Sequence, residues 1–144
     1  MYKNKPIHAK TIRAGVIPYY VSCDIIYMMF LKPADPIKGG DCFQISKGRV
    51  EENENFQKAA VREGGEELGL LESNIISIYE MGEYLTRMFM YAIKIENMGD
   101  FGVYEEETGA IRWMTIGEFM EEGRELHRPI VEDIHKRILE IEKI

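Results

Sequence analysis

The residues with the clearest chemical potential are the carboxylates between residues 48 and 70. Glu63, Glu66 and Glu67 occupy positions i, i+3 and i+4, so in a helix they share one face. Carboxylates crowded on one face repel one another, and a hard divalent cation with oxygen ligands offsets that repulsion. Glutamate runs are also common on the solvated face of an amphipathic helix, so the spacing alone leaves both interpretations open.

The flanking residues narrow the choice. In order, the segment reads Gly48, five residues, Glu54, seven residues, Arg62-Glu63, two residues, Glu66-Glu67, one residue, Gly69-Leu70. This pattern resembles the Nudix box, G-x5-E-x7-R-E-U-x-E-E-x-G-U, in which U is a bulky apolar residue. One position departs, because Gly64 stands where the family has an aliphatic side chain. A helical glycine costs about 0.5–1 kcal/mol relative to alanine, so we expect a locally weak helix there, with close approach of a neighbouring group.

The resemblance implies a metal-dependent hydrolase of pyrophosphate bonds, with an α/β/α sandwich fold. Phosphoryl transfer to water depends on positioning and on neutralising charge, which a bound cation supplies while also acidifying a bound water. The resemblance implies Mg²⁺, with Mn²⁺ as an alternative. The implied metal ligands are the Gly48 carbonyl oxygen and the carboxylates of Glu63, Glu66 and Glu67.

Other acidic and basic residues have supporting roles by the same resemblance. Arg62 cannot bind a cation; it pairs with Glu54 and orients a glutamate. Glu54 has a second interpretation as an acid near a helix N-terminus, where the dipole favours negative charge. The general base is either Glu66 or a carboxylate from a later acidic loop, where Glu106 and Glu107 are the preferred candidates.

Candidate substrate contacts lie on both sides of the box. The Lys47-Gly48 pair, and Arg13 before Ala14-Gly15-Val16, resemble the diadenosine polyphosphate hydrolases and RNA 5′-pyrophosphohydrolases of the family. Arg13 and Lys47 are therefore candidate phosphate contacts, although either is also an ordinary surface charge. Tyr84 and Tyr91 are candidates for stacking on an adenine, with packing in a strand as the alternative.

The order of apolar and turn-forming segments predicts an α/β fold, a mixed sheet between helices, in one domain spanning residues 1–144. Strands are predicted at 11–20, 24–31, 42–45, 75–82, 85–96 and 111–114. Helices are predicted at 54–68, at 115–120 and from Pro129 onwards, and an acidic loop at 100–109. The apolar stripe of the last helix consists of Ile130, Ile134, Ile138 and Ile141.

Composition limits the classes of partner. The net charge of −7 argues against non-specific nucleic-acid binding through a basic surface, but not against a phosphate substrate bound with cations. No segment has the length of a transmembrane helix, and the polar start, residues 1–10, does not resemble a signal peptide. We therefore expect a cytoplasmic protein with a small nucleotide substrate and no membrane partner. A homodimer is an open alternative, and the scattered histidines, including His127, are expected at the surface.

Three functions stay open. The leading hypothesis is hydrolysis of a nucleoside diphosphate linked to another moiety, with a dinucleoside polyphosphate as the preferred substrate. The second is cleavage of ADP-ribose, FAD or NADH, or of RNA 5′ ends. The third is a non-catalytic nucleotide-binding module, against which the intact set of Glu63, Glu66 and Glu67 argues, since a module without a metal has no need of mutually repelling charges.

Overall fold

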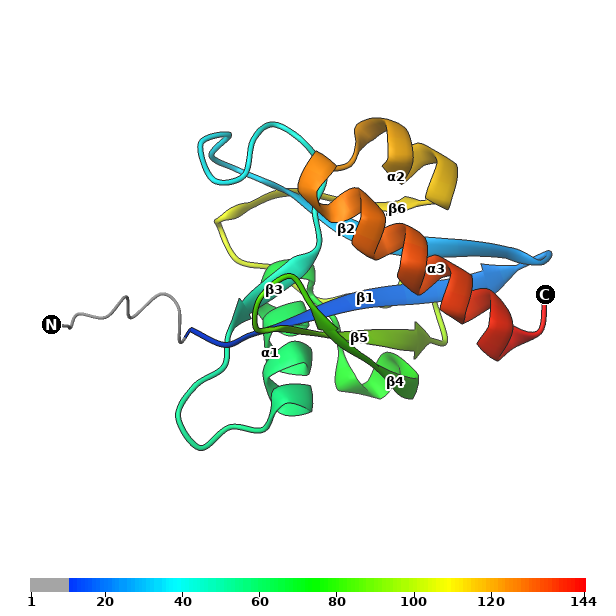
Figure 1. Ribbon diagram of the computed structural model, residues 1–144, viewed down its shortest axis with the longest axis horizontal. Helices are drawn as coiled ribbons and strands as arrows, with labels where there is room; N and C mark the ends of the chain where they lie inside the picture. Colours follow the sequence, from blue (N-terminus) through cyan, green and yellow to red (C-terminus); the bar gives the residue numbers. More distant parts are fainter. Residues whose placement is uncertain (1–10) are drawn as a thin grey trace, which may run out of the picture.

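The computed structural model describes residues 11–144, and the polar start at residues 1–10 lies outside the described residues. Figure 1 shows the elements in chain order along the colour ramp. The strands are β1 (Arg13–Ser22), β2 (Ile25–Pro33), β3 (Ser46–Arg49), β4 (Ile75–Tyr84), β5 (Met88–Ile95) and β6 (Thr108–Met114). The helices are α1 (Phe56–Leu68), α2 (Ile116–Glu122) and α3 (Arg128–Glu142), with short 3-10 turns η2 (Glu72–Asn74) and η3 (Glu125–His127).

β1 is the central strand of a six-stranded mixed sheet with the order β4-β5-β1-β2-β6. It pairs in parallel with β5 and antiparallel with β2 and β3. β3 pairs with the first residues of β1 and β2 with the last, so two strands share one side of β1. Residues 14–19 of β1 are buried one after another, which is typical of a strand covered on both faces.

Helices cover both faces of the sheet. On one face, α3 packs Val131, Ile134 and Ile138 onto a core that contains Phe119 of α2. On the other face, α1 packs two small side chains, Ala59 and Ala60, against β1 and β5. Figure 1 shows α3 running across the sheet, with α1 on the opposite side. The predicted mixed α/β fold with a sheet between helices is confirmed.

Most element boundaries differ from the prediction by a few residues, and three of the differences have a clear local cause. α1 begins at Phe56 rather than at residue 54, because the Asn55 side chain accepts the Lys58 N–H and caps the helix. The strand predicted at 42–45 contributes only isolated bridges, and β3 follows it at Ser46–Arg49. β6 begins at Thr108, inside the predicted acidic loop, because it pairs with β2 from that residue onwards.

No helix within residues 11–144 combines the length and the apolar composition that crossing a membrane requires.

Candidate active site

The end of α1 is fixed by glycines. Gly69 adopts a left-handed conformation with φ of 78°, and its N–H donates to the Gly65 carbonyl while the Leu70 N–H donates to that of Gly64. A Cβ at Gly64 would lie 3.0 Å from side-chain atoms of both Leu70 and Val16. The close approach expected at Gly64 is therefore present: neighbouring side chains fill the space that an aliphatic residue would take.

Arg62 donates hydrogen bonds to three carboxylates on or next to α1. Its Nε and Nη2 donate to the two carboxyl oxygens of Glu54, at 2.9 and 3.1 Å. Its Nη1 donates to Oε2 of Glu63 at 2.9 Å and to Oε2 of Glu66 at 3.3 Å. Nη2 also donates to the Arg49 carbonyl of β3. These bonds, to Glu54 first, raise the pKa of Arg62, and the pairing implied by the resemblance is present.

Glu63 is packed directly against β3. Its side chain is nearly buried, and a Cβ at Gly48 would overlap its carboxyl group. Burial raises the pKa of Glu63, while the bond from Arg62 opposes that rise. The carboxyl lies at the edge of an open depression of about 560 Å³. The depression is lined by Arg49, Val50, Glu51, Glu52, Arg62, Glu63 and Glu66.

Glu67 is anchored to the same strand in a different way. Its Oε1 accepts from Ser46 Oγ at 2.7 Å and from the Lys47 N–H at 3.0 Å. Burial is the main cause that raises the pKa of Glu67 to about 7. Ser46 was not predicted as a site residue, and only its place directly before Lys47-Gly48 could have suggested it.

The carboxylates fit a hard divalent cation by chemistry rather than by present geometry. Within residues 11–144, no three acidic, histidine or cysteine side chains are already gathered as metal ligands. Glu63 and Glu66 share the Nη1 donor of Arg62, so their Oε2 atoms lie within two hydrogen-bond lengths of each other at the acidic depression. Hard oxygen donors of this kind suit Mg²⁺, which usually keeps several waters.

The later acidic loop reaches the end of α1 through Glu105. Its N–H donates to the Glu66 carbonyl at 2.8 Å. Burial, then the charges of Glu107, Glu66 and Glu63, raise the pKa of Glu105. The side chains of Glu106 and Glu107, the predicted candidates, are exposed. The role of a loop acid as general base stays a prediction, and Glu105 joins the candidates.

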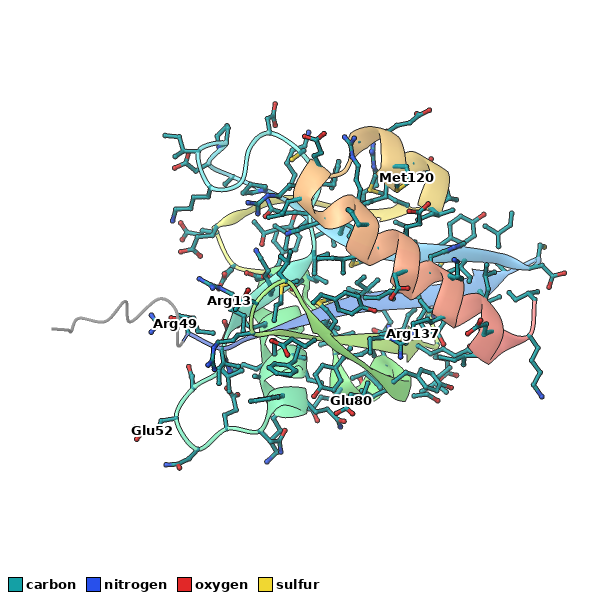
Figure 2. All side chains as sticks on the ribbon, in the orientation of Figure 1. Arg13, Arg49, Glu52, Glu80, Met120 and Arg137 are labelled. Atoms are coloured by element: carbon teal, nitrogen blue, oxygen red, sulfur yellow. The ribbon has the colours of Figure 1, made fainter. Side chains whose placement is uncertain are left out.

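Arg13 and Lys47 lie together on the face of β3 turned away from α1. The register pairs Gly15 with Lys47 and Arg13 with Arg49, so these residues share one face of the β1–β3 ladder. Figure 2 shows Arg13 and Arg49 at the same end of the sheet. A cavity of about 350 Å³ opens on this side. It is lined by Arg13, Lys47, Leu85, Thr86, Met88, Arg124, Leu126 and His127.

The expectation that His127 is a surface residue is wrong, because it is fully buried. Its Nδ1 accepts from the Ile45 N–H at 3.1 Å, which places the ring proton of the neutral imidazole on Nε2. Burial, then the charges of Lys47 and Arg124, lower the pKa of His127 to about 3. No spacing rule links these residues, because Ile45 and His127 are 82 positions apart.

The two candidate tyrosines do not join this cavity. Tyr84 donates its hydroxyl to Asp133 of α3 and accepts from Arg137, so both functions of its hydroxyl are engaged. Tyr91 is 3% exposed and packs in the core beneath α1, on the other face of the sheet. These positions favour packing, the alternative stated from the sequence, and the stacking role stays a prediction.

Comparison with family models gives the assignment. Residues 30–134 match the model described as the NUDIX domain, well over half of the 144 residues. The chain belongs to the Nudix family. It is accordingly a Nudix pyrophosphohydrolase, and Nudix hydrolases generally use divalent metal ions. Comparison with curated protein sequences gave no significant match.

Solved structures share the Nudix fold at low sequence identity. A C. elegans Ap4A hydrolase in a binary complex has a TM-score of 0.64 and 16% identity, covering 88% of this chain and 98% of that chain. A structure from a study of MutT from Aliivibrio salmonicida and Vibrio cholerae has a TM-score of 0.65 and 17% sequence identity, and the match covers 88% of this chain and 98% of that chain. The NUDIX domain of Shewanella oneidensis NrtR, complexed with ADP ribose, has a TM-score of 0.59 and 9% sequence identity, and the match covers 95% of this chain and 94% of that chain. At these identities the likeness establishes the fold.

Proposed function

We propose that this Nudix enzyme hydrolyses a pyrophosphate bond in a dinucleoside polyphosphate by attack of water at phosphorus. The observation that carries the proposal is the pairing of two sites across β3. The carboxylates around Arg62 lie on one face, and Arg13 and Lys47 line a cationic cavity on the other. A substrate with several phosphates can reach both sides of one four-residue strand.

The metal-binding residues proposed are Glu63, Glu66 and Glu67, with the Gly48 carbonyl oxygen. The donor chemistry described above supports Mg²⁺, with Mn²⁺ as the alternative. When bound, the cation screens phosphate charge and acidifies a water. Gly48 supports this assignment because the absence of a Cβ lets the Glu63 carboxyl lie against the strand.

The protein's own groups then move the proton and hold the geometry. Glu66 is the exposed member of the cluster, so we assign it the proton of the attacking water. Arg62 holds Glu63 and Glu66 through one nitrogen, which fixes the spacing between them. A loop acid is the alternative base. Within that loop we favour Glu105, because the negative charges of Glu66 and Glu63 contribute to raising its pKa.

ADP-ribose is the second candidate substrate. The fold is shared with a domain described as complexed with ADP ribose, and such a ligand also carries a pyrophosphate between two bulky groups. FAD and NADH belong to the same test, and RNA 5′ ends are a further alternative substrate. A cytoplasmic location, one domain over residues 1–144 and a possible homodimer are retained as hypotheses.

The test is turnover on a panel with Mg²⁺, separated by chromatography. The panel contains diadenosine tri- and tetraphosphate, ADP-ribose, FAD, NADH and the nucleoside triphosphates. We expect release of ADP or ATP from the diadenosine compounds to be fastest. Faster release of AMP from ADP-ribose or FAD would assign the second substrate class. No turnover on any nucleotide with Mg²⁺ or Mn²⁺ would refute the enzyme hypothesis.

A matched pair of variants ties turnover to the proposed site. Glu66→Gln keeps the shape of the side chain and removes its charge and basicity, so we expect turnover to fall at least about 100-fold. Glu132→Gln makes the same change at an exposed position of α3 and should leave turnover unchanged. Equal turnover in both variants would remove Glu66 from the mechanism.

A further inference from the structure

The cavity behind β3 gathers positive charge in an acidic protein. Arg13, Lys47 and Arg124 all line it, although the chain has 25 acidic and 18 basic residues. Within residues 11–144, none of the three has a carboxylate oxygen within salt-bridge distance. Clustered cations of this kind attract an anion, and phosphate is an anion that both arginine and lysine commonly bind in proteins.

His127 provides an independent observation that points to a ligand. It lines the cavity, is fully buried, and carries its ring proton on Nε2 because Nδ1 accepts from the Ile45 N–H. Among the described residues, this Nε2–H has no acceptor. Buried donors in folded proteins are normally paired, so an unpaired one at a cavity wall requires an explanation.

Arg124 can adjust to bring an acceptor within reach. Its guanidinium donates to the Gln44 side chain at 3.5 Å, the long limit for a hydrogen bond. A side chain held by so long a hydrogen bond can change rotamer when an anion enters the cavity, and such rotamer changes are common when a ligand binds. Arg124 follows α2 and His127 ends η3, so the same short connection supplies both groups.

The rim of the cavity is apolar and half exposed. Leu85 is 51% exposed and Leu126 is 50% exposed, and Met88 lies between the cavity and the core. Leu85 has a φ of 53° in the turn between β4 and β5, a conformation that a leucine rarely adopts. Backbone strain of this kind often persists where a turn holds a side chain at a ligand. The rim thus suits the nucleoside attached to a phosphate.

We propose that this cavity is a nucleotide-binding subsite that works without the metal, in which Arg124 and the Nε2–H of His127 join Arg13 and Lys47 on the phosphates. Leu85 and Leu126 contact the nucleoside. The choice of a nucleotide as ligand rests on the proposed function, whereas the anion site rests on the cavity itself. The subsite holds one end of the substrate while the other side of β3 carries the reacting phosphate.

Binding of ADP in the presence of EDTA, measured by calorimetry, tests the subsite apart from turnover. We expect the wild-type protein to bind ADP without metal, and Arg124→Gln to weaken binding at least about tenfold. Lys136→Gln removes the same charge from an exposed position of α3 and should bind as the wild type does. No binding by the wild type, or equal binding by R124Q, would overturn the proposal.

Two substitutions of His127 separate its role in binding from its role in folding. In His127→Asn the amide oxygen replaces Nδ1 as acceptor for Ile45 and the Nε2–H is lost, so ADP binding should fall about tenfold with the fold retained. In His127→Gln the amide reaches the Nε2 position, so ADP binding should persist while the melting temperature falls. Unchanged binding by folded H127N would remove His127 from the subsite.

Inorganic pyrophosphate is the second probe. ADP should bind more tightly than pyrophosphate if Leu85 and Leu126 contact the nucleoside, and equal affinity would overturn that contact. ADP binding in EDTA together with no turnover on any nucleotide would keep the subsite and reject the proposed function. Turnover without metal-free binding would do the reverse.

Discussion

The two faces of β3 have opposite charge, and neighbouring residues of the strand point to opposite faces. Ser46 and Gly48 face the carboxylates of α1, whereas Lys47 between them faces the cationic cavity. Successive side chains of a strand point to opposite faces, so four residues are enough to separate the two environments. The carboxylate side contains its own counter-charge, Arg62, with four acidic partners.

The cavity side has no such internal partner among residues 11–144. Arg13, Lys47 and Arg124 have no carboxylate within salt-bridge distance. Burial, then the charge of Arg124, lowers the pKa of Lys47, while the charge of Glu67 opposes that change. The comparison shows how one short strand can present two different charge environments to a substrate rich in phosphate. On one face Arg62 offsets part of the negative charge from within the fold, whereas the cations on the other face have no salt-bridge partner among residues 11–144.

Gly48→Ala is expected to have the largest effect, because it inserts a methyl group where the Glu63 carboxyl lies. Displacing that carboxyl should reduce turnover at least about 100-fold, while metal-free ADP binding on the other face remains. Gly117→Ala, where a Cβ would meet no atom within 4 Å, is the matched control. Equal losses of turnover and ADP binding would show that the two faces are not independent.

Arg62→Met removes the internal counter-charge of the carboxylate face. Its side chain is 25% exposed, so we expect unfolding free energy to fall by about 2 kcal/mol in urea titrations. Added Mg²⁺ should recover part of this loss, because it replaces the missing positive charge. Arg112→Met breaks the exposed pair with Glu122 and should cost less than about 1 kcal/mol, without a Mg²⁺ effect.

The cavity face should make stability depend on pH through His127. The pKa of His127 is lowered from 6.5 to about 3 on folding, so between these values the unfolded chain binds a proton that the folded protein does not. Stability therefore falls as pH drops below about 6.5, by up to about 1.4 kcal/mol per pH unit from this residue.

Urea titrations of wild type and His127→Asn over this pH range isolate the effect. The variant has no titrating ring, so its stability should decline less steeply than that of the wild type. His135→Asn is the control: burial also lowers the pKa of His135, but its side chain is only partly buried. Parallel pH profiles for wild type and H127N would contradict the burial of a neutral His127.

The smallest effects concern the adjacent glycines of α1. A Cβ at Gly65 would lie 3.4 Å from the Leu70 carbonyl oxygen, an ordinary contact, so Gly65→Ala should stabilise the protein by about 0.5–1 kcal/mol. At Gly64 the contacts to Leu70 and Val16 are tighter, so Gly64→Ala should gain less or lose stability. Thermal melts of both variants measure the difference, and a larger gain at Gly64 would contradict this packing.

The carboxylate face was largely predictable from sequence because its contacts are local. Arg62 lies within eight residues of Glu54 and four of Glu66, and helix geometry brings such positions together. The start of α1 was misplaced by two residues, because Glu54 resembles a first-turn acid while Asn55 forms the cap.

The cavity face was only half predictable. Lys47 and Arg13, which line the cavity, were proposed from the resemblance, and their contact with phosphate stays a prediction. Arg124 and His127 come from a connection 80 or more residues beyond Gln44 and Ile45, the residues to which they bond. Their approach depends on how α2 and α3 cross the sheet, which no periodicity encodes. For the same reason, burial of His127 was missed, since a lone histidine carries no pattern that reports its neighbours.

The acidic loop is fastened to the last turn of α1 by three hydrogen bonds. The N–H groups of Gly102 and Glu105 donate to the carbonyls of Gly69 and Glu66, and the Thr108 hydroxyl donates to that of Glu67. These carbonyls have no partner inside the helix, so the loop completes it. The amides of Gly102 and Glu105 should then exchange with deuterium together with those of α1, as one cooperative unit.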